Sequence, residues 1–200
     1  MRKAILIFGH GYATQFIDIS NQYTKLFDPA KFEVTVAYLI GEPDEKIRQR
    51  HLAEQVCFLN FSKRATRGLK IAAIKKMLQL QREKKFQMVI CHRYKPSYIM
   101  LWVARFCRIP ALFFVMHELK TLSSIPRKLI VAALMRKNML FAGVSNAVRD
   151  DIRRDIWGVP AEQVITLYNM IDIELTEPTF LERSAARAKL NLSENSFVFG

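Results

Sequence analysis

Short apolar runs recur along the chain and alternate with segments whose apolar residues repeat at helical spacing. The runs predict buried strands, because they are rich in branched and aromatic side chains and are bounded by polar residues or glycine. We expect strands at residues 4–8, 32–40, 56–61, 88–91, 111–116, 139–144 and 164–168. A regular alternation of strand and helix favours an α/β, doubly wound domain with a mostly parallel sheet.

Residues 139–172 show this alternation most clearly. An apolar run ends at Ser145, an amphipathic segment follows, Gly158-Val159-Pro160 stops it, and a second apolar run begins. This order predicts a strand, a capped helix, a turn and a strand, which together make one right-handed βαβ crossover. Asp150 and Asp151 fall in the early turns of the helix and complement its dipole, so we interpret them as structural.

The pattern changes after Asp172. Residues 174–178 are typical of a connector, residues 180–190 predict a helix, and residues 196–200 predict the start of a new strand. We therefore expect one domain over residues 1–176. Residues 177–200 are expected to form a linker helix and the first strand of a second, truncated domain.

A glycine-containing segment, Gly9-His10-Gly11-Tyr12, follows the first predicted strand. It begins like a dinucleotide-binding fingerprint, but Thr14 replaces the third glycine and no acidic residue ends the second strand to hold a ribose. The segment is therefore weak evidence for NAD binding. Backbone N–H groups in such a segment can approach a phosphate, and a tight turn without any ligand explains the residues equally well.

Two histidines directly follow predicted buried strands: His92 comes after residues 88–91 and His117 after residues 111–116. A lone histidine is more often structural than catalytic. The carboxyl ends of parallel strands share one crevice, however, which favours a functional role for the pair. Glu118 fits either a general base or a cap on the next segment. No spacing of histidines and carboxylates indicates a metal site.

The composition narrows the class of protein and its partners. The chain has 200 residues, half of them apolar, so it can bury a sizeable core and disorder is not expected. A formal net charge of +13 points to a polyanionic partner, which is nucleic acid, an anionic membrane surface or a phosphorylated substrate. The three cysteines are widely spaced, which fits reduced thiols and a cytoplasmic location. No apolar run is long enough for a signal peptide or a membrane span.

Much of the positive charge falls in residues 63–85, which we expect to form one long helix. Glu83 is the single acidic residue among nine basic ones: Lys63, Arg64, Arg67, Lys70, Lys75, Lys76, Arg82, Lys84 and Lys85. Two interpretations compete. The segment is either a solvated surface helix or a helix that attracts anionic lipid, with an apolar stripe beneath its basic residues. No RNA-binding module is visible, so we do not expect a nucleic acid partner.

Three motifs close to one another carry a resemblance to a known family: Val144-Ser145-Asn146-Ala147-Val148-Arg149, Gly158-Val159-Pro160-Ala161-Glu162-Gln163-Val164 and Asn169-Met170-Ile171-Asp172. They resemble the last crossover of the N-terminal domain in GT-B glycosyltransferases, and most of all glycosyltransferase family 4. The glycine segment, His92 and His117-Glu118 also fall where that family places them, so the resemblance covers essentially the whole chain. Met170 departs from the pattern, because the family usually has glycine there.

The resemblance implies the Rossmann-like, acceptor-side N-terminal half of a two-domain GT-B enzyme, with a nucleotide-sugar donor in the cleft between the domains. It implies sugar transfer to a glycan or lipid-linked acceptor, as in cell-envelope polysaccharide or lipopolysaccharide synthesis. The family retains anomeric configuration and generally needs no metal, so we expect neither metal nor cofactor. We expect a cytoplasmic enzyme, peripheral on the inner face of the cell membrane through residues 63–85.

In this family the histidine that matches His117 contacts the donor sugar near the reacting centre, so the resemblance implies that His117 is catalytic. Most residues that hold the nucleotide belong to the C-terminal domain, so this chain by itself is expected to be inactive or nearly so. Contacts with donor or acceptor are expected from Gly9, His10, Gly11, Tyr12, His92, Arg93, Glu118 and Ser145.

Two other functions stay open on the sequence alone. The first is a non-enzymatic α/β nucleotide-binding or receiver-like module, which predicts no second Rossmann-like domain after Gly200. The second is a basic nucleic-acid-binding protein, suggested by charge alone. A steeply salt-dependent affinity for DNA or RNA would indicate the second.

Overall fold

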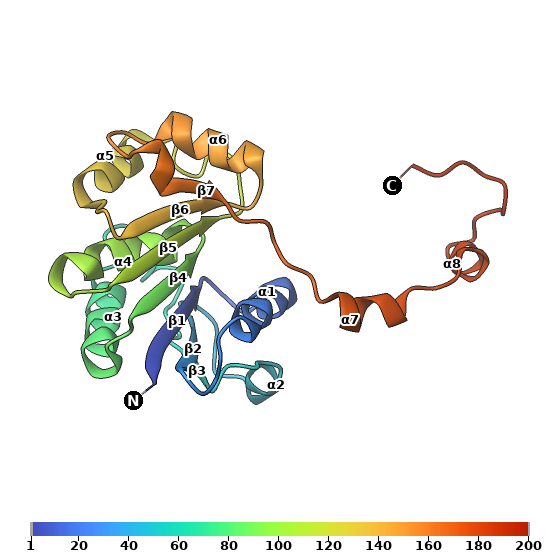
Figure 1. The fold of residues 1–200 in the computed structure, drawn as a ribbon, viewed down its shortest axis with the longest axis horizontal. Coiled ribbons are helices and arrows are strands. Elements are labelled where there is room, and N and C mark those ends of the chain that lie inside the picture. Colours follow the sequence, from blue (N-terminus) through green and yellow to red (C-terminus); the bar gives the residue numbers. More distant parts are fainter. Residues whose placement is uncertain (1, 200) are drawn as a thin grey trace. The chain divides into compact units, whose positions relative to one another are not determined.

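The computed structural model describes residues 2–199, in which seven parallel strands form one sheet in the order β3-β2-β1-β4-β5-β6-β7 (Figure 1). Every neighbouring pair in this order is parallel, which confirms the predicted α/β, doubly wound sheet. The strands are β1 (Lys3–Gly9), β2 (Phe32–Tyr38), β3 (Gln55–Phe58), β4 (Met88–His92), β5 (Ala111–Met116), β6 (Met139–Gly143) and β7 (Val164–Thr166).

Helices cover both faces of the sheet because successive residues of a strand point to opposite faces. Ile5 and Ile7 of β1 pack in one core with residues of α1 (Thr14–Lys25) and α2 (Glu45–Gln49). Leu6 and Phe8 pack in a second core. That core is covered by α3 (Ile71–Lys84), α4 (Tyr94–Phe106), α5 (Ile125–Leu134) and α6 (Asn146–Asp155). Figure 1 shows α1 and α2 on one side of the sheet, and α3 and α4 on the other.

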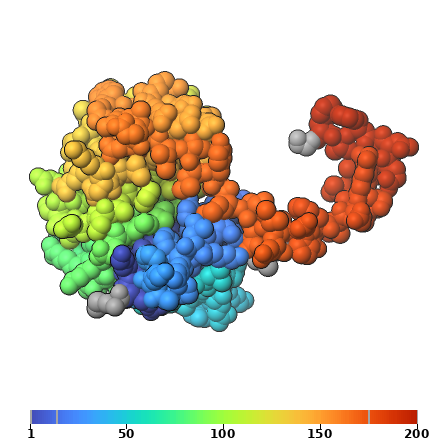
Figure 2. All heavy atoms as spheres, viewed as in Figure 1, coloured from blue at the N-terminus to red at the C-terminus, as the bar shows by residue number. Residues whose placement is uncertain are grey.

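The space-filling view shows α1, in blue, beside the cyan segment around α2 (Figure 2). Hydrogen bonds hold the two together: the Asn21 amide donates to the carbonyl of Arg50 at 2.8 Å and accepts from the backbone N–H of Leu52 at 2.9 Å.

The order of the strands reverses between β1 and β4. The chain leaves β1 toward β2 and β3, crosses the sheet through α3, and then adds β4 to β7 on the other side. Connections from the two halves therefore diverge at the carboxyl ends of β1 and β4. In open α/β sheets, such a reversal point is where ligands bind.

The basic segment differs from its prediction. Helix α3 begins only at Ile71, and residues 62–70 form turns rather than the first part of a helix. Side-chain oxygens compete with helical hydrogen bonds here, because Ser62 accepts from the N–H of Ala65 at 3.2 Å. Gly68 and Lys70 then take left-handed backbone angles, with φ of +57° and +53°. The expected single helix over residues 63–85 is therefore wrong for its first third.

Local contacts set where two other helices begin. Asp44 caps α2 by accepting from the N–H groups of Lys46 and Ile47. Helix α4 begins at Tyr94 with Pro96 in its first turn, where the missing N–H needs no partner.

Residues after Met170 form a separate unit, described here by itself. It holds α7 (Ile173–Thr176) and α8 (Arg183–Lys189), with a short 3₁₀ helix at Glu177–Thr179 between them. Helix α8 is shorter than the predicted residues 180–190. No strand forms at residues 196–199, so that prediction is wrong there, and Gly200 lies outside the described residues. Phe197 and Phe199 are 84% and 90% exposed. A strand needs a neighbour to pair with, and this unit supplies none within the described chain.

Candidate functional site

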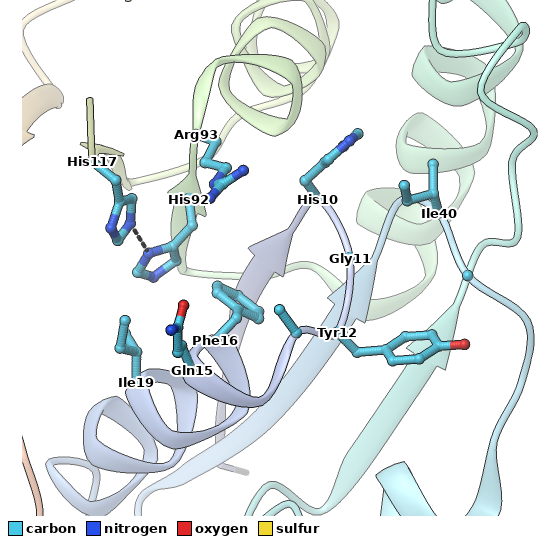
Figure 3. A pocket seen from close by; sticks show the side chains of 12 residues that line it. His10, Gly11, Tyr12, Gln15, Phe16, Ile19, Ile40, His92, Arg93 and His117 are labelled. Carbon is cyan, nitrogen blue, oxygen red and sulfur yellow. Dashed lines mark hydrogen bonds between the residues drawn. The ribbon is translucent and has the colours of Figure 1, made fainter. Parts of the chain in front are cut away.

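Two adjoining pockets lie where β1, β4 and β5 end. The first encloses about 420 Å³ and is lined by the β1–α1 segment, one face of α1 and the residues that end β4 and β5 (Figure 3). The second encloses about 340 Å³ and continues over the starts of α4 and α5. His10, Arg93 and His117 line both pockets and thus join them.

The β1–α1 segment brings His10, Gly11 and Tyr12, three of the expected ligand contacts, to the first pocket. The ring of Tyr12 points away from the histidines and packs edge-on against Tyr38 and Phe58, with centroids 5.6 and 5.7 Å away (Figure 3). This packing explains Gly41, since a Cβ there would stand 2.2 Å from Cε1 of Tyr12. The segment is therefore anchored by its tyrosine.

Gly9 does not line either pocket. A Cβ on Gly9 would lie 2.4 Å from Cε1 of Phe16, so glycine is needed to seat that ring. Phe16 lines the first pocket and packs edge-on against His92 at a centroid distance of 5.0 Å. Gly9 therefore acts on the pocket through Phe16.

His92 and His117 meet at the ends of β4 and β5. Nδ1 of His92 lies 3.0 Å from Nε2 of His117, a hydrogen-bond distance (Figure 3). His92 is 1% exposed and lies near the rings of Phe16 and Tyr23. Its Nε2 is buried and finds no hydrogen-bond partner in the described part of the chain. His117 is half-buried and reaches both pockets. The structure thus brings together the two histidines that the sequence placed after separate strands.

The surroundings of His92 decide which nitrogen carries its proton. A buried N–H without an acceptor is rarer and more costly than an unpaired acceptor. We therefore assign the proton of His92 to Nδ1, which donates to Nε2 of His117. His117 then carries its own proton on Nδ1, and that N–H is the group left for a ligand.

Both imidazoles are held neutral. Burial, reinforced by the neighbouring His117, lowers the pKa of His92 to about 3. Burial and then Arg93 lower the pKa of His117, and Glu118 partly offsets them. At neutral pH the pair offers directed hydrogen bonds rather than charge.

Arg93 sits in a strained backbone conformation between the two pockets. Its φ is +70°, which an L-residue with a side chain seldom adopts. The strain is held from both sides: the N–H of Arg93 donates to the carbonyl of Val115 at 2.9 Å, and its carbonyl accepts from the Ser97 hydroxyl at 2.8 Å. The guanidinium lies 3.7 Å from Glu118, and both side chains are exposed, so this ion pair contributes little stability.

His10 is the third histidine of the site. Its Nδ1 is buried and has no hydrogen-bond partner within residues 2–199. Burial lowers its pKa, and the charges of Lys95 and Arg93 lower it further. His10 therefore stands neutral at the border of the two pockets, with one ring nitrogen unused.

Ser145 lines neither pocket. Its hydroxyl accepts from the N–H of Val148 at 3.2 Å, which caps α6 as the sequence predicts. The structure thus gives Ser145 a local structural role.

Several residues that line the pockets were not foreseen. Gln15, Phe16 and Ile19 share one face of α1, and this helical spacing was visible in the sequence. Arg127 reaches the second pocket from α5, and no spacing along the chain could indicate that. The unforeseen residues are Ala13, Gln15, Phe16, Ile19, Ile40 and Gly41 in the first pocket, and Tyr94, Lys95, Leu119, Lys120, Thr121 and Arg127 in the second.

Within residues 2–199, no three side chains of His, Cys, Asp or Glu come together as a metal-binding group. In the same part of the chain, no helix combines the length and apolar character that a membrane span requires.

Comparison with known sequences identifies one family. The model of Glycosyltransferase Family 4 matches residues 12–175, which include both pockets apart from part of the β1 end. The sequence has no significant match among curated proteins.

Solved structures share the fold at low sequence identity. A glycosyltransferase from Rickettsia africae ESF-5 superposes with a TM-score of 0.66 at 10% identity, over 97% of this chain and 51% of that one. Sucrose-phosphate synthase from Thermosynechococcus elongatus gives 0.63 at 11% identity, over 97% and 54%. A UDP-GlcNAc 2-epimerase from Neisseria meningitidis, bound to UDP-GlcNAc, gives 0.59 at 16% identity, over 97% and 56%. The chain thus spans about half the length of the structures it matches.

Proposed function

Since the chain belongs to glycosyltransferase family 4, we propose that it is the acceptor-side half of a GT-B enzyme that transfers a sugar from a nucleotide-sugar to a glycan or lipid-linked acceptor. The observation that carries the proposal is the pair of pockets joined by His117 at the reversal point of the sheet. One pocket receives the acceptor, and the shared wall faces the reacting sugar.

The size and lining of the first pocket support this assignment. A volume of about 420 Å³ falls in the range typical of small-molecule sites. Aromatic and aliphatic side chains, such as Phe16 and Ile19, form most of its wall, and a few polar groups at one end can fix orientation. Sugar rings combine apolar faces with hydroxyl edges, which such a wall accommodates.

The chemistry requires two things of the protein. The acceptor hydroxyl must stand close to the anomeric carbon, and the departing diphosphate must be stabilised electrostatically. This chain would provide the first: His117 would orient the donor sugar by donating from Nδ1 to a sugar hydroxyl, while His92 holds its ring. By resemblance to the family, the diphosphate would be held mainly by a second domain, and the chain alone would then have little or no activity.

The proposal is tested by His117→Ala in the full-length enzyme. We expect turnover to fall about 100-fold, because a directed hydrogen bond and the correct placement of the sugar are both lost. The variant should stay folded, with a melting temperature lowered by a few degrees, because the buried Nδ1–H of His92 loses its acceptor. His51→Gln is the matched control, because His51 is a buried histidine outside both pockets. Turnover close to wild type in His117→Ala would remove this residue from the mechanism.

Product analysis distinguishes the remaining alternatives. UDP-N-acetylglucosamine 2-epimerases share this fold, so the released product must be shown to be a glycoside and not an epimerised donor. Retention of anomeric configuration and activity in the presence of a metal chelator are the further expectations. Inversion, or loss of activity on chelation that added metal restores, would contradict them.

We also propose a peripheral contact with anionic membranes. Leu69 and Ile71 expose 67% and 56% of their surface where α3 begins. Lys63, Arg64 and Arg67 precede them in the same turn-rich segment and are exposed. Exposed apolar side chains next to basic ones suit the surface of an anionic bilayer.

A further inference from the structure

Basic side chains converge on the second pocket. Arg93, Lys95, Lys120 and Arg127 all line it, and Glu118 is the one carboxylate in its lining. That carboxylate lies beside Arg93, which leaves the charges of the other three cations unbalanced at the pocket. Such an excess indicates an anionic ligand.

Lys70 extends this basic cluster beyond the lining residues. The charges of Lys95 and Arg127 lower the pKa of Lys70, after the larger effect of burial, so the three cations repel one another. None of the three forms an ion pair with a carboxylate within residues 2–199. Lys95 instead lies 3.4 Å from the hydroxyl of Thr66. Like charges held together without a counter-charge cost stability that a bound anion would recover.

Aromatic rings hold two of these cations in place. The guanidinium of Arg127 lies 4.3 Å from the ring centre of Tyr94, and the Lys70 ammonium lies 4.2 Å from that of Tyr98. The two rings are 6.0 Å apart. The guanidinium of Arg127 also donates to the carbonyl of Thr121 at 2.5 Å. The cations are therefore pre-organised over an aromatic pair and are not free to swing into solvent.

The backbone of the cluster is strained as well. Six non-glycine residues in the described chain have positive φ, and three of them are Lys70, Arg93 and Lys120. Each such conformation is strained and persists where the surroundings over-determine it, which is typical of ligand sites. In addition, α4 and α5 begin at this pocket with no acidic residue in their first turns, so their positive dipole ends stay uncompensated.

We propose that the second pocket binds the phosphate of a phosphorylated acceptor, with Lys95 and Arg127 as its principal ligands. This inference rests on the proposed function and names its substrate class. The phosphate would be a monoester or a diphosphate. Because the pockets share His10, Arg93 and His117, a phosphate in the second one places an attached sugar in the first. The phosphate has two possible sources, a soluble sugar phosphate or the phosphate of a lipid carrier.

The first experiment measures binding of inorganic phosphate, inorganic diphosphate and glucose 1-phosphate to the chain by calorimetry at constant ionic strength. Lys95→Gln and Arg127→Gln should each weaken binding at least about 10-fold, as expected for loss of one charge-assisted contact. Lys75→Gln and Arg82→Gln are the controls, because they remove the same charge from exposed positions on α3 outside the second pocket. Their affinity should stay within about twofold of the wild type.

Two results would overturn the proposal. Equal weakening in all four variants would show general attraction to a basic protein, and an absence of saturable binding to the wild type would show that no phosphate site exists. Both results are independent of whether the full-length enzyme transfers sugar, which the His117→Ala assay tests. The failure of one proposal is therefore distinguishable from the failure of the other.

The second experiment separates acceptor from donor, and soluble from lipid sources. In the full-length enzyme, Lys95→Gln should raise KM for the acceptor and leave KM for the nucleotide-sugar unchanged; the reverse pattern would assign the site to the donor and overturn the proposal. Neutral phosphatidylcholine vesicles with and without a polyprenyl phosphate are then compared with soluble glucose 1-phosphate. Stronger binding of one probe that Lys95→Gln weakens supports the site and identifies the source of the phosphate. If Lys95→Gln changes the binding of neither probe, the proposal is contradicted.

Discussion

The imidazole of His92 is buried among aromatic rings, and one of its nitrogens forms a hydrogen bond with His117. Its other nitrogen has no partner, which is a cost that a purely structural side chain such as leucine would avoid. The arrangement makes sense if His92 fixes the proton of His117 on Nδ1. His92 is then a positioning residue, whereas His117 faces the ligand.

Two substitutions test this role in the full-length enzyme. His92→Leu removes the donor, and we expect kcat to fall about 10-fold, the equivalent of one neutral hydrogen bond, with a small effect on KM. His92→Asn can place an N–H near the position of Nδ1 and should recover most of the loss. The ¹⁵N shifts of His117 should report Nδ1–H in the wild type and a shift toward Nε2–H in His92→Leu. Unchanged tautomer and turnover in His92→Leu would contradict the assignment.

His51 is the one histidine outside the site, and its contacts explain why it is neutral. Nε2 lies 2.7 Å from the Tyr38 hydroxyl and Nδ1 lies 3.3 Å from that of Ser20, which itself donates to the carbonyl of Ile17 at 2.8 Å. Every donor and acceptor in this hydrogen-bond network has a partner if Nδ1 of His51 carries the proton and Nε2 accepts from Tyr38. A second proton on Nε2 would remove the acceptor for the Tyr38 hydroxyl and disrupt the network.

Acid should therefore destabilise the fold. Burial, followed by the charge of Arg50, lowers the pKa of His51 to about 4, whereas an unfolded histidine has a pKa near 6.5. Between these values the unfolded chain binds more protons, so stability is fully present above about pH 6.5 and is lost as pH falls toward about 4. One such proton gives a slope of at most about 1.4 kcal/mol per pH unit.

Urea denaturation at a series of pH values checks this expectation. The free energy of unfolding of the wild type should fall from pH 7 to pH 4.5, and His51→Gln should show a shallower fall because one proton-binding group is gone. His92 contributes to the same slope, so the variant reduces it without abolishing it. An identical slope in both proteins would show that His51 is not a buried neutral group.

At the scale of elements, α6 holds the loop that follows β5. Asp151 is buried on α6, and its carboxylate accepts from the backbone N–H of Lys120 at 2.6 Å and from Arg154. One turn later Asp155 binds Lys128 of α5 at 3.2 Å. The loop that follows β5 carries Glu118 and Lys120 of the second pocket. Asp151, which the sequence suggested as a complement to the helix dipole, thus fixes a wall of the site.

Asp151→Ala leaves the Lys120 N–H without its partner. We expect a loss of about 1–3 kcal/mol in the free energy of unfolding, measured in urea, together with weaker phosphate binding. Asp150→Ala is the matched control, because Asp150 is the neighbouring aspartate, is exposed and pairs with Arg149. The free energy of unfolding of this variant should stay close to that of the wild type. Equal losses in the two variants would attribute the effect to helix charge instead of the loop contact.

The elements that the sequence predicted well are those that burial determines. Both faces of a central parallel strand are covered, so strands such as β5 are continuous apolar runs and their positions were confirmed. Prediction failed where backbone conformation depends on local polar contacts, as in residues 62–70, or on a missing neighbour, as in residues 196–199. Neither a local polar contact nor the lack of a neighbouring strand changes the hydrophobic pattern from which the elements were predicted.

The same division applies to the site. His92 and His117 could be predicted to lie together because the ends of parallel strands meet at one edge. Arg127 could not, since its place depends on how α5 packs beside α4 and on its contact with the Tyr94 ring. Side chains that reach a pocket from helices carry no signal beyond ordinary amphipathic spacing.

At the scale of the whole molecule, the net charge of +13 has two separate explanations. Part of it, including Lys95 and Arg127, converges on a pocket, where a bound anion offsets it. Another part, including Lys63, Arg64 and Arg67, is exposed beside apolar side chains and lines neither pocket. Only the second group of basic residues suits a membrane surface, so substitutions in each group should affect different kinds of binding.

Vesicle binding measures the membrane contribution. The chain should bind vesicles rich in phosphatidylserine and not those of phosphatidylcholine, and added salt should weaken binding because screening shortens the range of the attraction. Arg64→Gln with Arg67→Gln should weaken it about 30-fold, at about 1 kcal/mol for each charge near the surface. The double substitution Arg105→Gln with Arg108→Gln removes the same charge from exposed positions near the other end of α4 and should have a smaller effect. Equal binding to both kinds of vesicle would reject the proposed contact with anionic membranes. Equal effects of the two double variants would show that vesicle binding depends on net charge and not on residues 63–71.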